Sequence, residues 1–153
     1  MSTGRFLTTH VGSLPRPDYL LKLIFAREGG ETVAEDTLDE AVERATGEIV
    51  TRQKQAGIDV VNDGEMSKPS YATYIKHRLS GFGGEAGQYE FADLEEFPGA
   101  KAQVFGNRGR AKRVAPACTA PIEVIDMDAP RIDAERLNRL ADGHATFMSA
   151  ASP

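Results

Sequence analysis

The sequence predicts an α/β fold, and three observations carry that prediction. Residues 58–61 form a short run of mostly branched apolar residues that is entered from Gly57, as in a buried strand. The preceding residues 37–56 carry apolar side chains at three- and four-residue steps, which is typical of an amphipathic helix. A further strand-forming run, residues 5–11, lies before the helical region. Two apolar strands joined by helices are expected to be parallel and connected by a right-handed crossover.

The first predicted strand, residues 5–11, ends at a loop with two prolines. Gly12 allows another group to approach the backbone closely, and Ser13 offers both a hydroxyl and an N–H, so this loop is a candidate ligand site. The alternative is an ordinary loop, since Gly-Ser pairs are common in turns. His10 could hold a metal or a substrate, although a lone histidine is more often a hydrogen-bonded structural residue.

Two helices are predicted next. Residues 18–26 form a short apolar helix that ends at a pair of glycines. The following helix has a capping-box pattern at Thr37 and Glu40, and Gly57 supplies a left-handed stop.

The strand that follows Gly57 ends in Asp63-Gly64-Glu65. Groups that contact ligands in α/β proteins gather at the carboxyl ends of the strands, so Asp63 and Glu65 are candidate functional residues. The alternative is that both acids cap the next turn.

The middle of the chain is less regular. We expect a loop and a helix up to residue 79, then an excursion at about 82–125 with extended segments near 88–91, 103–105 and 113–115. The glycines of residues 81–87 do not fit a dinucleotide-binding loop. A basic cluster at residues 108–113 could receive an anion, but a solvated turn is favoured. Cys118 has no neighbouring histidine or second cysteine to suggest zinc or a nucleophile. The last third predicts a helix over 131–141 and a third buried strand from residue 144.

Composition limits the partners and the compartment. The chain has 153 residues, 41% of them hydrophobic and 27% charged, as expected for one globular domain. Its net charge of −5 argues against nucleic acid or an anionic membrane as a partner. A single cysteine permits no internal disulfide, and no secretory signal or membrane-spanning run is visible, so a cytoplasmic location is expected.

Four stretches together carry a family resemblance. They are Thr8–Pro17, which contains Val-Gly-Ser-Leu-Pro-Arg-Pro, then Gly57–Glu65, which ends in Asp-Gly-Glu, then Leu79–Phe82, and lastly Val114–Ile122. In this order they resemble the cobalamin-independent methionine synthase family, and most closely its short, single-barrel members. The resemblance spans nearly the whole chain.

The resemblance implies a (β/α)8 barrel that transfers a methyl group from a methylated folate to a thiol such as homocysteine, with zinc and without cobalamin. By the same resemblance, Gly12 and Ser13 match the loop that holds the amino acid's carboxylate, and Glu65 matches the acid that pairs with its amino group. None of His10, His77, His144 or Cys118 matches the family's zinc ligands, so no metal is expected in this chain.

An eight-stranded barrel needs typically about 250 residues, so residues 1–153 are expected to form the amino-terminal portion of one barrel domain, its first three βα units. The leading hypothesis is a methyltransferase represented by its amino-acid-binding part and inactive alone. The alternative is a non-catalytic amino-acid-binding or interaction module of the same fold. Open sheet edges predict self-association.

Overall fold

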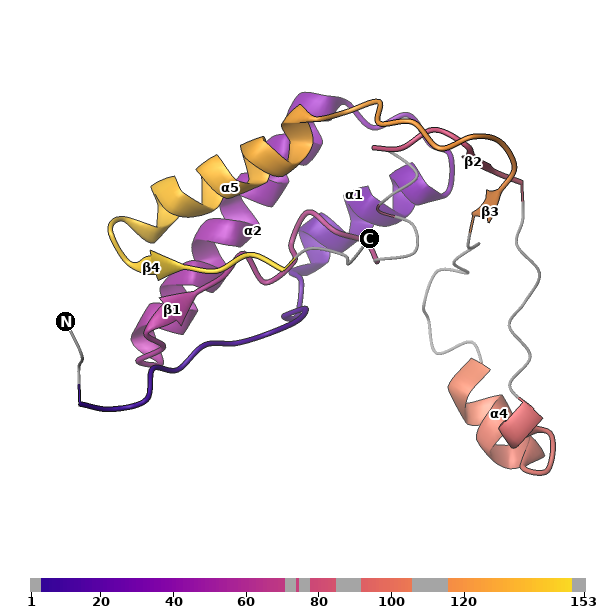
Figure 1. Ribbon diagram of the computed structural model, residues 1–153, viewed down its shortest axis with the longest axis horizontal. Coiled ribbons are helices and arrows are strands. Elements are labelled where there is room, and N and C mark those ends of the chain that lie inside the picture. Colours follow the sequence, from indigo (N-terminus) through magenta and orange to yellow (C-terminus); the bar gives the residue numbers. More distant parts are fainter. Residues whose placement is uncertain (1–3, 71–73, 75–77, 85–91, 106–115, 150–153) are drawn as a thin grey trace.

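A computed structural model describes residues 4–70, 74, 78–84, 92–105 and 116–149, and it has two parts (Figure 1). The first part, here called the body, combines three helices with a small parallel sheet. Its elements are α1 (Asp18–Glu28), α2 (Glu35–Gln55), β1 (Val60–Val61), α5 (Asp128–Ala141) and β4 (Ala145–Thr146). The second part, here called the excursion, leaves the body after residue 78 and returns before α5. Its elements are β2 (Phe82–Gly83), the 3₁₀ helix η2 (Ala92–Leu94), α4 (Pro98–Phe105) and β3 (Ala117–Cys118).

The sheet of the body is parallel and short. β1 pairs with β4, with Val60 opposite Ala145 and Val61 opposite Thr146, and Thr9 forms an isolated parallel bridge with Val60. Three segments therefore run in the same direction and lie side by side in chain order. The predicted third strand is present over two residues, but it is not buried as predicted, because Ala145 is exposed and Thr146 is only half-buried. The strand predicted over residues 5–11 is wrong except at Thr9.

The side chain of Asp59 explains why the first strand is not regular. Its carboxylate accepts hydrogen bonds from the backbone N–H of Thr8, at 2.8 Å, and from the guanidinium of Arg5. The Thr8 carbonyl in turn accepts the N–H groups of both Asp59 and Val60. The Thr8 N–H thus bonds to a side chain, and the backbone pairing of this segment with β1 is confined to the Thr8 carbonyl and the bridge at Thr9.

The ends of α2 test two sequence predictions. The helix begins at Glu35, and its N-cap residue Ala34 makes no side-chain capping bond, so the predicted Thr37–Glu40 capping box is wrong. Two acids, Glu35 and Asp36, occupy the first turn instead, where they interact favourably with the helix dipole. The predicted stop is correct: Gly57 has φ +76°, and the N–H of Ile58 bonds back to the carbonyl of Gln53.

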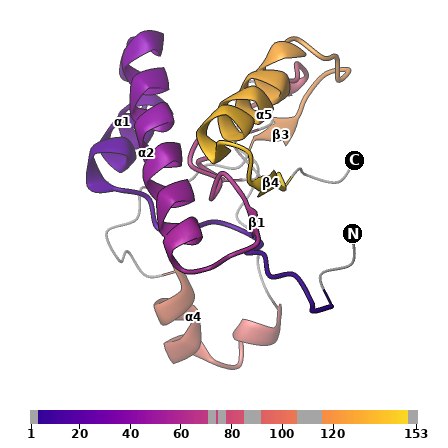
Figure 2. The ribbon, with the colours of Figure 1, turned by 90° about the vertical axis from the view of Figure 1, so that its left-hand side faces the viewer.

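α2 is the central helix of the body. Figure 2 shows α1 and α5 on either side of it. Its buried residues contribute to two apolar clusters, one shared with α1 and Met66, the other with β1 and α5. The clusters contain Leu20, Ile24, Ala41, Val42, Ala45, Ile49 and Met66, and Val50, Val61, Leu137 and Ala141.

α5 begins three residues before the predicted helix of residues 131–141. The carboxylate of Asp126 accepts the N–H groups of Asp128 and Ala129, both at 2.9 Å, and so satisfies two donors that a helix start leaves without intrahelical partners. The helix ends as expected near Gly143, which has φ +79°.

The excursion is built around an antiparallel ribbon. β2 pairs with β3, with Phe82 opposite Cys118, and Leu79 forms a further antiparallel bridge with Val124. In Figures 1 and 2, α4 stands apart from the helices of the body.

One further correction concerns residues 103–105, which were predicted to be extended and are the end of α4. Pro98 occupies the first helical position, where its missing N–H has no intrahelical role, and alanines follow. The predicted extended segments at 88–91 and 113–115 and the basic cluster at 108–113 lie outside the described residues, as does most of the helix expected before residue 79.

Candidate functional site

The two predicted strand exits meet in the structure. The hydroxyl of Ser13 donates a hydrogen bond to the carboxylate of Glu65, and the N–H of Leu14 donates to the carbonyl of Gly64 at 3.0 Å. The side-chain amide of Asn62 donates to the carbonyl of His10. Two segments far apart in the sequence are therefore joined by hydrogen bonds next to the parallel sheet. The structure thus brings together two of the candidate site residues, Ser13 and Glu65.

Glu65 adopts an unusual backbone conformation. Its φ is +58°, in the left-handed region that non-glycine residues rarely occupy, and only 3% of its surface is exposed. A side-chain oxygen of Asp63 accepts the N–H of Glu65 at 3.0 Å and holds this turn. Backbone strain of this kind concentrates at functional sites, where the surrounding structure enforces it. The turn directs a nearly buried carboxylate at the Gly12-Ser13 loop.

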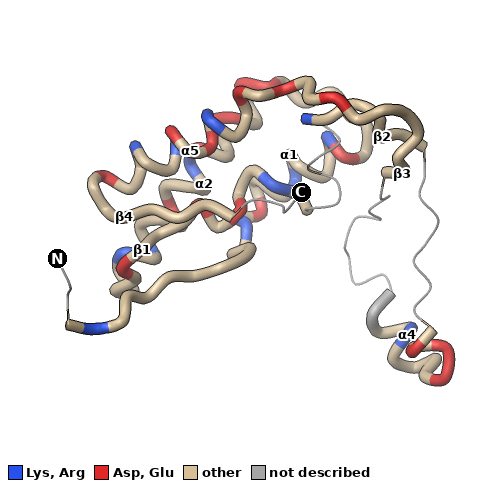
Figure 3. Tube along the Cα trace, viewed as in Figure 1, with Lys and Arg blue, Asp and Glu red and all other residues tan. Residues whose placement is uncertain are grey.

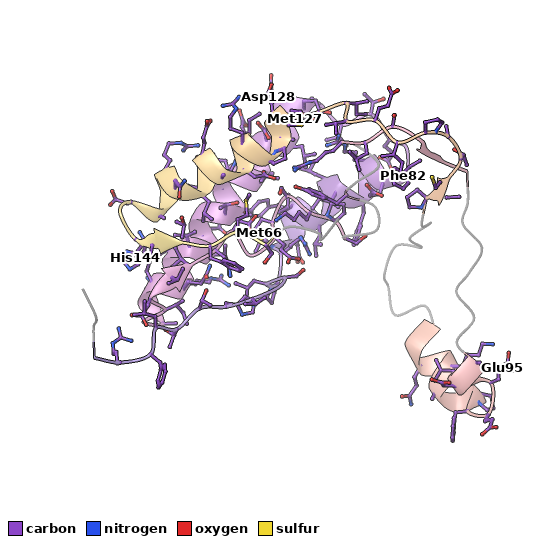
Figure 4. The ribbon with its side chains drawn as sticks, in the orientation of Figure 1. Met66, Phe82, Glu95, Met127, Asp128 and His144 are labelled. Atoms are coloured by element: carbon purple, nitrogen blue, oxygen red, sulfur yellow. The ribbon has the colours of Figure 1, made fainter. Side chains whose placement is uncertain are left out.

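Gly64 is required by this turn. It has φ +60°, and a Cβ placed there would lie 3.0 Å from Met66, 3.2 Å from Leu14 and 3.3 Å from Ile49. Each residue of the Asp-Gly-Glu sequence thus has a part in the turn: Asp63 accepts the N–H of Glu65, and Gly64 and Glu65 adopt the left-handed conformation. Figure 4 shows Met66, which directly follows Glu65, in the middle of the body.

The two weaker candidates have different surroundings. A ring nitrogen of His10 lies 3.1 Å from the carbonyl of Gly12, which is a contact within its own loop. The side chain of Asp63 is buried, and because it accepts the N–H of Glu65 it behaves as the turn-capping acid of the alternative interpretation. The capping interpretation therefore suits Asp63, whereas the Glu65 side chain contacts a different loop.

Sequence reasoning missed four residues that build the site, which are Gln53, Asn62, Arg16 and Lys68. Gln53, at the end of α2, donates to the Asn62 carbonyl at 2.8 Å and accepts the Asn62 N–H at 3.1 Å, which fixes the backbone where β1 ends. The guanidinium of Arg16 donates to the carbonyls of Glu65, at 2.6 Å, and Lys68. Arg16 lies within the Val-Gly-Ser-Leu-Pro-Arg-Pro motif, which was the available signal for it.

Lys68 is the fourth residue and the least expected. It is 3% exposed, and its ammonium lies 2.8 Å from the Ser149 carbonyl and 3.4 Å from a carboxylate oxygen of Asp63. No hydrophobic pattern predicts a buried lysine, since lysine is almost never fully buried without a partner.

A second charged cluster lies between α2, α5 and the segment that follows Glu65. Asp133 is buried and accepts hydrogen bonds from Arg78 at 2.8 Å and from Arg136 at 2.9 Å. Ser67 and Tyr74 also donate to it, and burial raises the pKa of Tyr74 well above its usual range. A pocket of about 320 Å³ adjoins this cluster. Figure 3 shows acidic and basic residues interspersed along α5.

Metal-binding groups do not gather in the part of the chain that the structure describes. No three His, Cys, Asp or Glu side chains within those residues are placed to hold a metal ion, so zinc has no fitting ligand set there. Cys118 is exposed on β3, and His144 lies at the turn between α5 and β4 (Figure 4). Among the described residues, no helix combines the length and apolar character needed to cross a membrane.

Comparison with known proteins bears on the family. The chain is 41% identical over 75 residues to the methionine synthase of Sulfolobus acidocaldarius and 35% identical over 75 residues to that of Pyrococcus furiosus. Each match covers 49% of this chain and 22% of the relative. The predicted resemblance to the methionine synthase family is confirmed. The matched part thus spans about a fifth of the length of these relatives, and no protein-family model matches the chain.

A solved structure has a similar fold. The B12-independent methionine synthase from Shewanella sp. W3-18-1, in complex with selenomethionine, superposes with a TM-score of 0.56 at 18% identity. The superposition covers 95% of this chain and 42% of the methionine synthase. The chain therefore resembles part of a B12-independent methionine synthase in its fold.

Proposed function

We propose that this chain supplies the amino-acid-binding groups of a methionine-synthase-like methyltransferase, in which a methyl group passes from a methylated folate to a thiol such as homocysteine. The observation that supports the proposal best is the meeting of Ser13 and Glu65, since the sequence resemblance implies that these positions bind the amino acid. The homology to methionine synthases and the shared fold support the same assignment.

The chemistry of the two loops suits an amino acid. A buried carboxylate at Glu65 can bind an ammonium group by a charge-assisted hydrogen bond, and the N–H groups of Gly12 and Ser13 can receive a carboxylate. Binding both ends of the amino acid fixes the direction of its sulfur, which favours transfer by positioning. In the transfer, the sulfur forms a bond to the methyl carbon as the bond from that carbon to the folate nitrogen breaks.

Zinc, which the family resemblance implies, lowers the pKa of a bound thiol and so raises its nucleophilicity. The described residues of this chain do not hold it, so their proposed contribution is binding and orientation. A contribution limited to binding and orientation also suits a second candidate function, a non-catalytic amino-acid-binding or interaction module. A reading frame that continues past residue 153 and encodes the family's zinc ligands would favour the enzyme over the module.

We further propose that Thr9, β1 and β4 correspond to the first three strands of a (β/α)8 barrel and that residues 1–153 belong to one barrel domain. Support comes from the parallel pairing of these segments in chain order. Both outer segments leave an edge open, and Phe6, Leu7 and Phe147 beside them are exposed, so the chain is expected to self-associate. Sedimentation at increasing concentration measures this, and a compact monomer at high concentration would contradict it.

The substitution Glu65→Gln tests the proposed function. It keeps the shape of the side chain and removes its charge, so homocysteine binding should weaken by roughly 1.5–3 kcal/mol while the melting temperature changes little. Calorimetric titration and thermal unfolding of the same samples measure both quantities.

The matched control is Glu123→Gln, which neutralises an exposed carboxylate on the ribbon of the excursion and should change neither quantity. A clearly lowered melting temperature with unchanged affinity in Glu65→Gln would show that Glu65 braces the turn and does not bind the amino acid.

A further inference from the structure

Lys68 connects the two strand exits of the sheet. Its ammonium donates to the carbonyl of Ser149, which follows β4, and lies beside the carboxylate of Asp63, which follows β1. Both charged side chains are almost completely buried, at 3% and 7% exposure. The Tyr74 ring lies 5.8 Å from the same ammonium. A single buried cation thus joins the ends of two parallel strands at the edge where Ser13 and Glu65 meet.

Stability alone does not account for this pair. Burying two opposite charges removes both from water, and their attraction often only offsets that desolvation, so well-packed apolar residues can serve stability equally well. What the pair adds is geometry. One oxygen of Asp63 faces Lys68 while the other accepts the N–H of Glu65. The lysine therefore fixes the carboxylate that holds Glu65 in its left-handed conformation.

We propose that Lys68 is a positioning residue for the amino-acid site. It does not contact the amino acid in this proposal, which rests on the proposed function of Glu65. Instead, its ammonium neutralises and orients Asp63, and Asp63 holds the turn that directs the Glu65 carboxylate toward the ammonium of the ligand. Its bond to the Ser149 carbonyl sets the distance between the exits of β1 and β4.

This proposal predicts selectivity in the loss of binding. Glu65 recognises only the amino end of the ligand, so disturbing Lys68 should affect ligands that carry an α-ammonium and spare those that lack it. L-methionine and its des-amino analogue, 4-(methylthio)butanoate, differ in that group alone. A general loss of structure would weaken the binding of both.

The experiment compares the 153-residue chain with the double variant Lys68→Met/Asp63→Asn, which removes the pair without leaving an unpaired buried charge. L-methionine affinity should fall about tenfold, within the range of a charge-assisted hydrogen bond, while 4-(methylthio)butanoate affinity changes less than about twofold. The matched control Lys22→Met, at an exposed lysine of α1, should leave both affinities unchanged. Equal losses for the two ligands, or no loss for either, would overturn the proposal.

A second measurement needs no ligand. Amide hydrogen exchange at Glu65, followed by NMR, should accelerate at least severalfold in Lys68→Met relative to Lys22→Met and more than exchange at Val50 in α2, because the Asp63 acceptor loses its fixed position. Equal acceleration at both amides would report general destabilisation and overturn the role of Lys68. Unchanged exchange would overturn the role of Lys68. If the wild-type chain binds neither ligand, the proposed function fails, and the exchange rate at Glu65 then decides separately whether Lys68 holds the turn.

Discussion

The body and the excursion of this chain are held together by different forces. In the body, α2 alone buries seven side chains, and helices on either side cover it. From Ala92 to Gln103 in the excursion, every residue is at least partly exposed, and Phe97 is 60% exposed. Backbone pairing between β2 and β3 is what closes the excursion. Buried apolar contacts thus stabilise the part that carries the candidate site, and the excursion is an appendage to it.

The largest expected difference between the two parts comes from removing an apolar side chain. Leu137 is 2% exposed and packs in the apolar cluster shared by α2, β1 and α5. Leu137→Ala should therefore lower the free energy of unfolding by roughly 2–5 kcal/mol. Phe97→Ala in the excursion should cost less than about 0.5 kcal/mol, as is usual for exposed positions. Urea unfolding measures both, and similar losses would show that the excursion shares the body's core.

A glycine pair sharpens the comparison at the site. Gly64→Ala forces a Cβ against Met66 and Leu14 in a left-handed backbone, and should destabilise the chain by roughly 1–3 kcal/mol. Gly99→Ala is its counterpart in α4, where a Cβ meets nothing within 4 Å. There the substitution should be neutral or slightly stabilising, because alanine favours the helix. A harmless Gly64→Ala would mean that the turn is looser than described.

A third glycine tests whether the ribbon folds independently of the body. A Cβ at Gly81 would lie 2.6 Å from the carbonyl oxygens of Ala120 and Pro121, closer than backbone atoms can tolerate. Gly81→Ala should therefore disrupt the ribbon, and fast amide exchange at Thr119 would report it. The unfolding midpoint of the body should stay within a few tenths molar urea of wild type. A large shift of that midpoint would contradict the independence of the two parts.

The smallest expected effect is electrostatic and lies at the edge of the body. Hydrogen bonds from Arg5 and then from Thr8 hold the pKa of the Asp59 carboxyl well below its usual range. A lowered folded-state pKa means that the interaction stabilises the fold above the unfolded pKa of about 3.9, and that this stabilisation is lost as pH falls through the folded value. Asp59→Asn should accelerate amide exchange at Thr8 at neutral pH. It should also remove the loss of protection of that amide that accompanies protonation of Asp59 in acid. If the Thr8 amide keeps its wild-type pH profile of exchange in Asp59→Asn, then Asp59 is not the group that protects this amide.

The sequence predicted those features of the fold and site that depend on local patterns. The apolar stripe and Gly57 defined α2 and its end, whereas the polar residues after each predicted strand made Ser13 and Glu65 candidates whose role in binding stays a prediction. The capping prediction at Thr37 failed because helix starts depend on small energies that neighbouring acids can also supply. Lys68 was missed because its partner Ser149 lies far along the chain. In the excursion, residues 103–105 were misassigned because a short helix whose residues 98–103 are all exposed carries no periodic signal.

The return of α5 and β4 to α2 and β1 has a kinetic consequence. The body's sheet and its second apolar cluster form only after the chain has closed a loop around the whole excursion, so these contacts have large sequence separation and should slow folding. The equilibrium cost of the loop grows only with the logarithm of its length, and each halving changes it by about 0.6 kcal/mol. Shortening the segment between Gly84 and Pro116 should therefore change the refolding rate of the body more visibly than its native-state population.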